Sequence, residues 1–205
     1  FPVIKNIFSQ GLQDPHPAVR IAALKAVGSL VKWISGEQEV ALFKELCPLM
    51  MKVIVGCIEQ GNDDEAIQAF ETFDDLIEAP AASINGLVPD IVRFCLQITT
   101  NSKVDWNVRQ HAATVVHWTV QYRKKTLVKQ KLFPDILTVA FNLCAEPDLD
   151  ADSDDVTNDI EDLEELTAHK YGAQLIDLLA LNVKPKYIYK PALQFVASFS
   201  SHQQA

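Results

Sequence analysis

The sequence predicts an all-α fold, a solenoid in which helix pairs stack one after another. Apolar residues recur at helical spacing along most of the chain, the pattern repeats about every 43–46 residues, and almost no alternating strand pattern is present. At 205 residues and 48% hydrophobic, the chain is large enough to bury a sizeable core. A helix pair cannot bury its apolar face alone, so the repeats must stack on their neighbours. A compact four-helix bundle is the alternative, but it does not predict the recurring prolines described next.

A proline opens the first helix of each predicted pair. The five are Pro2, Pro48, Pro89, Pro134 and Pro191, separated by 46, 41, 45 and 57 residues. An amphipathic stretch of about a dozen residues follows each of them, and the first helical turn tolerates proline because its missing N–H would go unused there. The spacing predicts four complete pairs and a fifth first helix.

A second helical stretch follows each of the first four. These stretches cover residues 14–31, 63–77, 105–120 and 164–181. In the first of them, Val19, Ala23, Val27 and Leu30 share the predicted apolar face. The resulting repeats are 1–36, 37–81, 82–126, 127–183 and a partial repeat 184–205. The fourth repeat holds about sixteen surplus residues, which form an acidic insertion at 146–163.

Two motifs mark the second helices. The segment "DPHPAVRIAAL" resembles the signature of HEAT repeats, and "VDWNVRQHAA" keeps its Val-Arg pair; the matching residues are Asp14, Pro15, Val19, Arg20, Val108 and Arg109. In order, the chain then shows "FKELCPLMMKVI", "GNDDEA", and "LFPDIL" followed by the acidic insertion. That order resembles nuclear transport receptors of the importin-beta superfamily, in particular the importin-4 and importin-5 branch with its fungal equivalents. The resemblance covers essentially the whole chain, as an internal segment of a longer superhelix.

The resemblance implies a function that involves no chemistry. Such receptors carry basic cargo, for example histones or ribosomal proteins, on a concave face made by the second helices, and release it when Ran-GTP binds. They shuttle between cytoplasm and nucleus, and their convex first helices bind Phe-Gly repeats of the nuclear pore. In HEAT stacks the arginine that follows valine, here Arg20, commonly pairs with an acidic residue of the neighbouring repeat. The acidic insertion is expected to contact Ran or basic cargo.

The insertion dominates the charge of the chain. Residues 146–165 hold eleven carboxylates and no Lys or Arg, while the rest of the chain has 18 basic and 16 acidic residues. This distribution disfavours direct nucleic-acid binding, which needs basic surface, and favours basic partners. A calcium loop is disfavoured because the insertion contains no glycine, whereas a solvated loop without a partner stays open. The candidate partner-binding residues are Glu146, Asp148, Asp150, Asp152, Asp154, Asp155, Asp159, Glu161 and Asp162.

A second candidate surface lies on the predicted helix 63–77 and its neighbour. Acidic and polar residues from Asp64 to Glu78 are spaced to share one face, opposite Ala66, Phe70, Phe73 and Ile77. In the third repeat Trp118 lies on the predicted outward face, where it could pack against a cargo lysine. Two alternatives involve no cargo. The carboxylates could form an ordinary solvated helix face, and Trp118 could be packed between stacked repeats. The candidate cargo-binding residues are Glu71, Asp75, Glu78 and Trp118.

The sequence predicts no enzyme, cofactor or metal site. His111 and His117 are six residues apart and point to different sides of a helix, and no Cys lies at ligand spacing. The four cysteines are predicted to be buried thiols, the basic run 123–131 a solvated turn, and no apolar run is long enough for a membrane span. Two rival functions remain: an acidic histone-chaperone-like protein, and a HEAT-repeat scaffold without Ran regulation.

Overall fold

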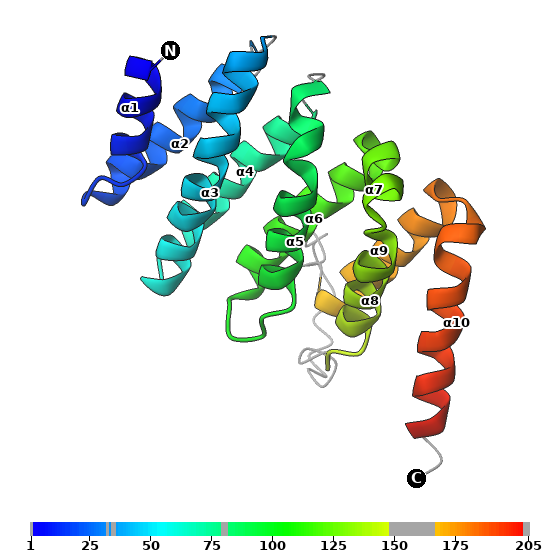
Figure 1. The fold of residues 1–205 in the computed structure, drawn as a ribbon. Helices are drawn as coiled ribbons and strands as arrows, with labels where there is room; N and C mark the ends of the chain where they lie inside the picture. The colour runs from blue at the N-terminus through cyan, green and yellow to red at the C-terminus, as the bar shows by residue number, and fades with distance from the viewer. Residues whose placement is uncertain (1, 32, 34–35, 79–81, 148–166, 203–205) are drawn as a thin grey trace, which may run out of the picture. The chain divides into compact units, whose positions relative to one another are not determined.

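The computed structural model describes residues 2–31, 33, 36–78, 82–147 and 167–202 of the chain. Every regular element in these residues is helical, comprising ten α-helices and one short 3-10 helix (Figure 1). This confirms the predicted all-α class with helices packed in repeating pairs. The chain divides into two compact units, Phe1–Gln130 and Lys131–Ala205.

The first unit contains three helix pairs. α1 (Pro2–Gly11) packs on α2 (Pro17–Val31), α3 (Glu37–Glu59) on α4 (Asp63–Glu78), and α5 (Val88–Thr99) on α6 (Trp106–Tyr122). The second helices also contact one another in order, α2 with α4 and α4 with α6, so they form a layer of their own. The 3-10 helix η1 (Ala82–Gly86) and the short helix α7 (Lys124–Gln130) both pack against α5.

The second unit contains one pair and one further helix. α8 (Phe133–Cys144) packs on α9 (Ala168–Asn182), and α10 (Pro185–His202) packs on α8. The rings of Phe141 and Phe195 stack with centroids 4.3 Å apart and an angle of 11° between their planes, which joins α10 to α8. Thr167 caps α9 by accepting a hydrogen bond from the N–H of Lys170 at 3.4 Å.

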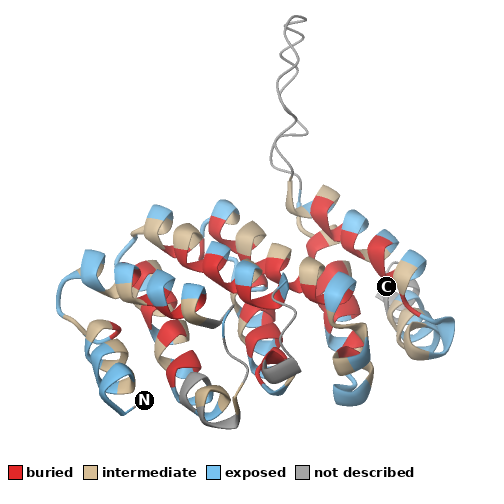
Figure 2. Cartoon of the chain, turned by 90° about the horizontal axis from the view of Figure 1, so that it is seen from above, coloured by how far each residue is buried: buried red, intermediate tan, exposed pale blue. Residues whose placement is uncertain are grey.

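Apolar residues at helical spacing build the core between the paired helices. Along α4, Ala66, Phe70, Phe73 and Ile77 are fully buried, as their spacing predicted. Figure 2 shows how buried residues gather on the facing sides of the helices while the outer sides are exposed. The α4 helix therefore has one face fixed by core packing and one face open for contacts with other molecules.

The prolines do not all have the predicted position. Pro89 and Pro134 occupy the first turn of α5 and α8, and Pro2 is the first residue of α1. Pro48 lies inside α3 and Pro191 inside α10, so the prediction that each opens a helix is wrong. An interior proline removes one backbone hydrogen bond but need not end a helix when the rest of the helix is held by packing. Pro48 itself is exposed.

The basic run 123–131 is not a simple turn, which corrects the prediction. Residues 124–130 form α7, and Leu127 within it is fully buried. Arg123 donates a hydrogen bond from Nε to the carbonyl oxygen of Ile77 at 3.0 Å, near the end of α4. One apolar side chain and one arginine thus anchor this segment to the first unit, while Lys125 and Lys129 are exposed.

The HEAT arginines bind backbone within their own helix pair. Arg20 donates from Nη1 to the carbonyl oxygens of Asp14 at 3.0 Å and Pro15 at 3.1 Å. Arg109 is 5% exposed and donates from Nε to the carbonyl oxygen of Thr99 at 2.8 Å, at the end of α5. The expectation that Arg20 pairs with an acidic residue of the neighbouring repeat is therefore wrong. Its guanidinium instead supplies donors to loop carbonyls that the helices leave unsatisfied.

The two signature valines differ in burial. Val108 is fully buried, whereas Val19 is 42% exposed. The prediction that Val19 belongs to the buried face of its helix is wrong, because the buried side of α2 is centred on Ile21, Leu24 and Val27. None of the described helices is long and apolar enough to cross a membrane.

Candidate functional site

Three carboxylates line the exposed side of α4. Glu71, Asp75 and Glu78 are all exposed and are spaced four and three residues apart. Side chains at this spacing lie one above the other on a helix. These three residues are called the acidic stripe below. The structure places them where the sequence predicted, and their role in binding stays a prediction.

Asp74 adds a fourth carboxyl group that the sequence analysis missed. It is half-buried beside the acidic stripe, and its Oδ1 atom is buried without a hydrogen-bond partner in the described residues. Burial, together with the negative charges of Glu78, Asp75 and Glu71, raises the pKa of Asp74 to about 7. Its spacing of three and four residues from two stripe residues is the sequence signal that could have found this crowding.

Trp118 lies on α6, the helix that packs against α4. It is half-buried, so it is neither fully outward nor fully lodged between repeats. Its ring stacks on Tyr122 with centroids 5.8 Å apart and meets His117 edge-on at 5.3 Å. Tyr122 is 52% exposed and was not singled out from the sequence. Trp118 and Tyr122 are called the aromatic pair below.

The two histidines of α6, His111 and His117, are partly buried. Burial lowers the pKa of His111 and of His117. The negative charge of Glu71 opposes this effect at His111, so this carboxylate of the stripe lies near α6. Burial therefore disfavours the charged form of both imidazoles.

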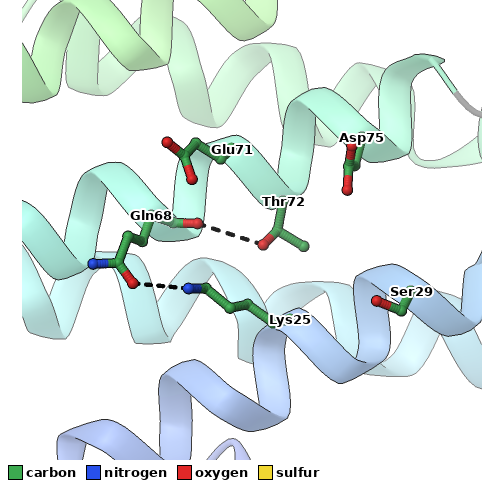
Figure 3. Close-up of a pocket in the computed structure, with 6 residues that line it drawn as sticks. All are labelled: Lys25, Ser29, Gln68, Glu71, Thr72 and Asp75. Atoms are coloured by element: carbon green, nitrogen blue, oxygen red, sulfur yellow. Dashed lines mark hydrogen bonds between the residues drawn. The ribbon is translucent and has the colours of Figure 1, made fainter.

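A cavity of about 350 Å³ lies between α2 and α4 (Figure 3). The Lys25 ammonium on α2 donates a hydrogen bond to Oε1 of Gln68 on α4 at 2.8 Å. Thr72 donates from its hydroxyl to the carbonyl oxygen of Gln68 at 3.5 Å. Two residues of the acidic stripe therefore share a cavity with a lysine from the neighbouring helix. The lining residues are Lys25, Ser29, Gln68, Glu71, Thr72 and Asp75.

The two helices approach each other closely beside this cavity, at Gly28 and Thr72. A Cβ atom on Gly28 of α2 would lie 2.2 Å from Cγ2 of Thr72 on α4. Glycine therefore lets the helices approach where a larger residue would push them apart. Since Lys25 and Ser29 are on the same helix as Gly28, this approach brings them beside Gln68 and Asp75.

Other predicted residues do not form a site in the described part of the chain. Of the acidic insertion, only Glu146 lies in the described residues; the predicted residues from Asp148 to Asp162 lie outside them. No group of three or more His, Cys, Asp or Glu in the described residues could hold a metal ion. Cys47, Cys57 and Cys95 are buried, Cys144 is half-buried, and burial raises the pKa of all four thiols.

The comparisons with known proteins all point to importins or IPO5-like proteins. The profile of "IPO5-like, TPR repeats" matches residues 1–94. Importin-4 of Mus musculus is 26% identical over 189 residues, which cover 88% of this chain and 17% of the relative. Importin subunit beta-3 of Saccharomyces cerevisiae is 22% identical. The match covers 94% of this chain and 18% of the yeast protein.

Solved structures show the same fold. Kap121p bound to RanGTP has a TM-score of 0.75 at 21% identity, and Kap121p bound to Pho4p has a TM-score of 0.76 at 20% identity. Each match covers 94% of this chain and 19% of the solved chain. The helix pairs therefore follow the arrangement of a karyopherin solenoid along almost the whole sequence.

The chain is similar to proteins of the importin-beta family along most of its length. Its similarity is to the importin-4 and IPO5-like members, as the order of motifs suggested. The chain spans 17% of the length of mouse importin-4.

Proposed function

We propose that this chain is part of a nuclear import receptor and binds basic cargo through the acidic stripe. The observation that carries the proposal is that three exposed carboxylates line α4, which packs against α6, the helix that holds the aromatic pair. Lysine and arginine side chains have an apolar stem and a charged tip, so they suit a surface with rings on one side and carboxylates on the other. Opposite charge would also steer basic segments to this face.

Similar proteins support the proposal. The curated relatives are importins by name, and Kap121p has been solved with Pho4p, with Nup53p and with RanGTP. For this chain we propose the corresponding partners: basic cargo on the second helices, Ran-GTP as the regulator of cargo release, and Phe-Gly repeats on the first helices. A receptor of this kind shuttles between cytoplasm and nucleus. The acidic insertion is proposed to contact Ran or basic cargo.

Charge reversal on α4 tests the cargo site. The double variant Glu71→Lys with Asp75→Lys should weaken a Lys-rich peptide about tenfold or more, because attraction becomes repulsion. Fluorescence anisotropy measures the affinity, and far-UV circular dichroism should be unchanged because both residues are exposed. The matched control is Glu59→Lys with Asp135→Lys, which makes the same charge change at exposed positions of α3 and α8. Equal affinity for the stripe variant and the wild type would place the cargo path elsewhere.

A competition assay with Ran distinguishes an import receptor from the two rival functions, an acidic chaperone-like protein and a HEAT-repeat scaffold. Ran-GTP, but not Ran-GDP, should displace a bound basic cargo from the receptor in a competition assay. An acidic chaperone-like protein would bind the cargo without any effect of Ran. A HEAT-repeat scaffold would show neither specific cargo binding nor displacement. Displacement by both nucleotide states, or by neither, contradicts Ran-regulated import.

A further inference from the structure

The cavity between α2 and α4 has a cation at one end and two carboxylates further along α4. Figure 3 shows Lys25 reaching from α2 toward Gln68, with Glu71 and then Asp75 further along α4. On α4, Glu71 lies about one helical turn after Gln68, and Asp75 lies about two turns after Gln68. The cavity therefore differs from a uniformly acidic surface, which would be expected to accept any basic peptide.

The charge of Lys25 is not neutralised inside the described structure. Its ammonium donates to the neutral amide oxygen of Gln68, and no carboxylate of the described residues forms an ion pair with it. An ammonium group carries three N–H donors, so two of them can bind another molecule. The side chain is exposed at the cavity, where an anion could reach it without displacing the bond to Gln68.

The distance along α4 between Gln68 and the two carboxylates is similar to the distance between side chains two residues apart in an extended peptide. From Gln68 to the midpoint between Glu71 and Asp75 is five helical residues, or about 7.5 Å at the usual rise. In an extended peptide, side chains two residues apart lie on the same face and are separated by about 6.5–7 Å. One peptide can therefore place an anion beside Lys25 and, two residues away, a cation between the two carboxylates.

We propose that this cavity selects basic cargo segments in which an anionic side chain lies two residues from a lysine or arginine. Lys25 binds the anion, and Glu71 with Asp75 bind the cation. The anion is a carboxylate or a phosphorylated serine, and phosphorylation at that position would strengthen cargo binding. This inference rests on the proposed function, since it names the class of cargo that the same α4 surface takes.

Peptide binding to the chain and to Lys25→Gln tests the inference. The probes are fluorescent peptides with the pairs Lys-x-Glu, Lys-x-phosphoserine and Lys-x-Gln, and one in which Glu is directly adjacent to Lys. In the wild type, Lys-x-Glu should bind about fivefold more tightly than Lys-x-Gln, the scale of one exposed charge pair, and phosphoserine more tightly still. The adjacent-Glu peptide should lose this gain because its anion points to the other face.

The Lys25→Gln variant should abolish the preference for an anion. It should bind Lys-x-Glu and Lys-x-Gln equally, while Lys52→Gln, which removes an exposed lysine of α3, keeps the wild-type preference. If Lys25→Gln keeps that preference, or if the wild type shows none, the inference is overturned. The proposed function would survive that result provided a Lys-rich peptide still binds and still depends on Glu71 and Asp75. If the Lys-rich peptide does not bind either, the proposed function falls as well.

Discussion

At the scale of single residues, two arginines bind backbone carbonyls at the turn between the helices of a pair. Arg20 binds the loop before α2, and Arg109 binds the last residue of α5. Arg109 also lies over the Trp106 ring, with its guanidinium carbon 5.3 Å from the ring centroid. The Val-Arg motif therefore stabilises the turn inside a repeat.

Removal of these arginines should destabilise the fold. Arg20→Ala and Arg109→Ala should each lower the free energy of unfolding by about 1–3 kcal/mol, because carbonyl groups lose their donors. The larger effect is expected at Arg109, which is buried. The measurement is urea unfolding followed by circular dichroism. Arg93→Ala is the control: its ion pair with Asp90 is exposed and worth less than about 1 kcal/mol. An equal loss in all three variants would contradict the assigned role.

The raised pKa of Asp74 makes stability depend on pH. Its pKa is about 7 in the folded chain, against about 3.9 for an unfolded Asp, so the folded state holds the proton more tightly. This contribution to stability is present below about pH 4 and is lost as the pH rises toward 7. Asp74→Asn should therefore stabilise the chain by about 1–2 kcal/mol at pH 8 and have little effect at pH 4.

Thermal unfolding from pH 4 to pH 8 measures this difference. The control is Asp177→Asn, which removes an exposed carboxylate of α9. A difference between Asp74→Asn and wild type that is constant over the whole pH range would show that the Asp74 carboxyl is not perturbed.

At the scale of helices, two glycines set how closely neighbours pack. Gly28 admits Thr72 between α2 and α4, and Gly172 lies against the backbone of α8. A Cβ atom on Gly172 would be 2.6 Å from the carbonyl oxygen of Ala140 and 2.7 Å from the backbone nitrogen of Cys144. Backbone atoms cannot move aside as a side chain can, so α9 itself would have to shift.

Gly172→Ala should destabilise the second unit by about 1–3 kcal/mol through overpacking. Gly56→Ala is the matched control, since it lies inside α3 with nothing within 4 Å of its added Cβ. That substitution should be neutral or stabilise by up to about 1 kcal/mol, because alanine favours helix. Equal thermal stability of the two variants would mean that α8 and α9 have room between them.

At the scale of the whole molecule, negative charge is concentrated in one segment. Residues 146–165 carry eleven carboxylates, while the remainder has 18 basic and 16 acidic residues. Long-range attraction of a basic partner would therefore act mainly through this segment, and salt would screen it over roughly 8–10 Å.

Replacement of residues 148–161 by a short Gly-Ser linker tests that role. Binding of a Lys-rich cargo and of Ran-GTP should weaken, and the remaining affinity should depend less steeply on salt. Thermal stability should change by less than about 1 kcal/mol, as is usual for changes in connecting segments. Titration calorimetry at low and physiological salt makes the comparison. Unchanged binding of both partners at low salt would identify the segment as a spacer.

The sequence by itself determined the all-α class, the paired helices, the first-turn positions of Pro89 and Pro134, and the exposed face of α4. Each of these depends on helical spacing or on local backbone chemistry, which a short window of sequence contains. Only the tertiary structure decided that Pro48 lies inside α3, that Arg20 binds backbone, and that Asp74 is half-buried. It also placed Lys25 beside Gln68, 43 residues away. These features depend on which side chains neighbouring helices bring together, and no local pattern encodes that.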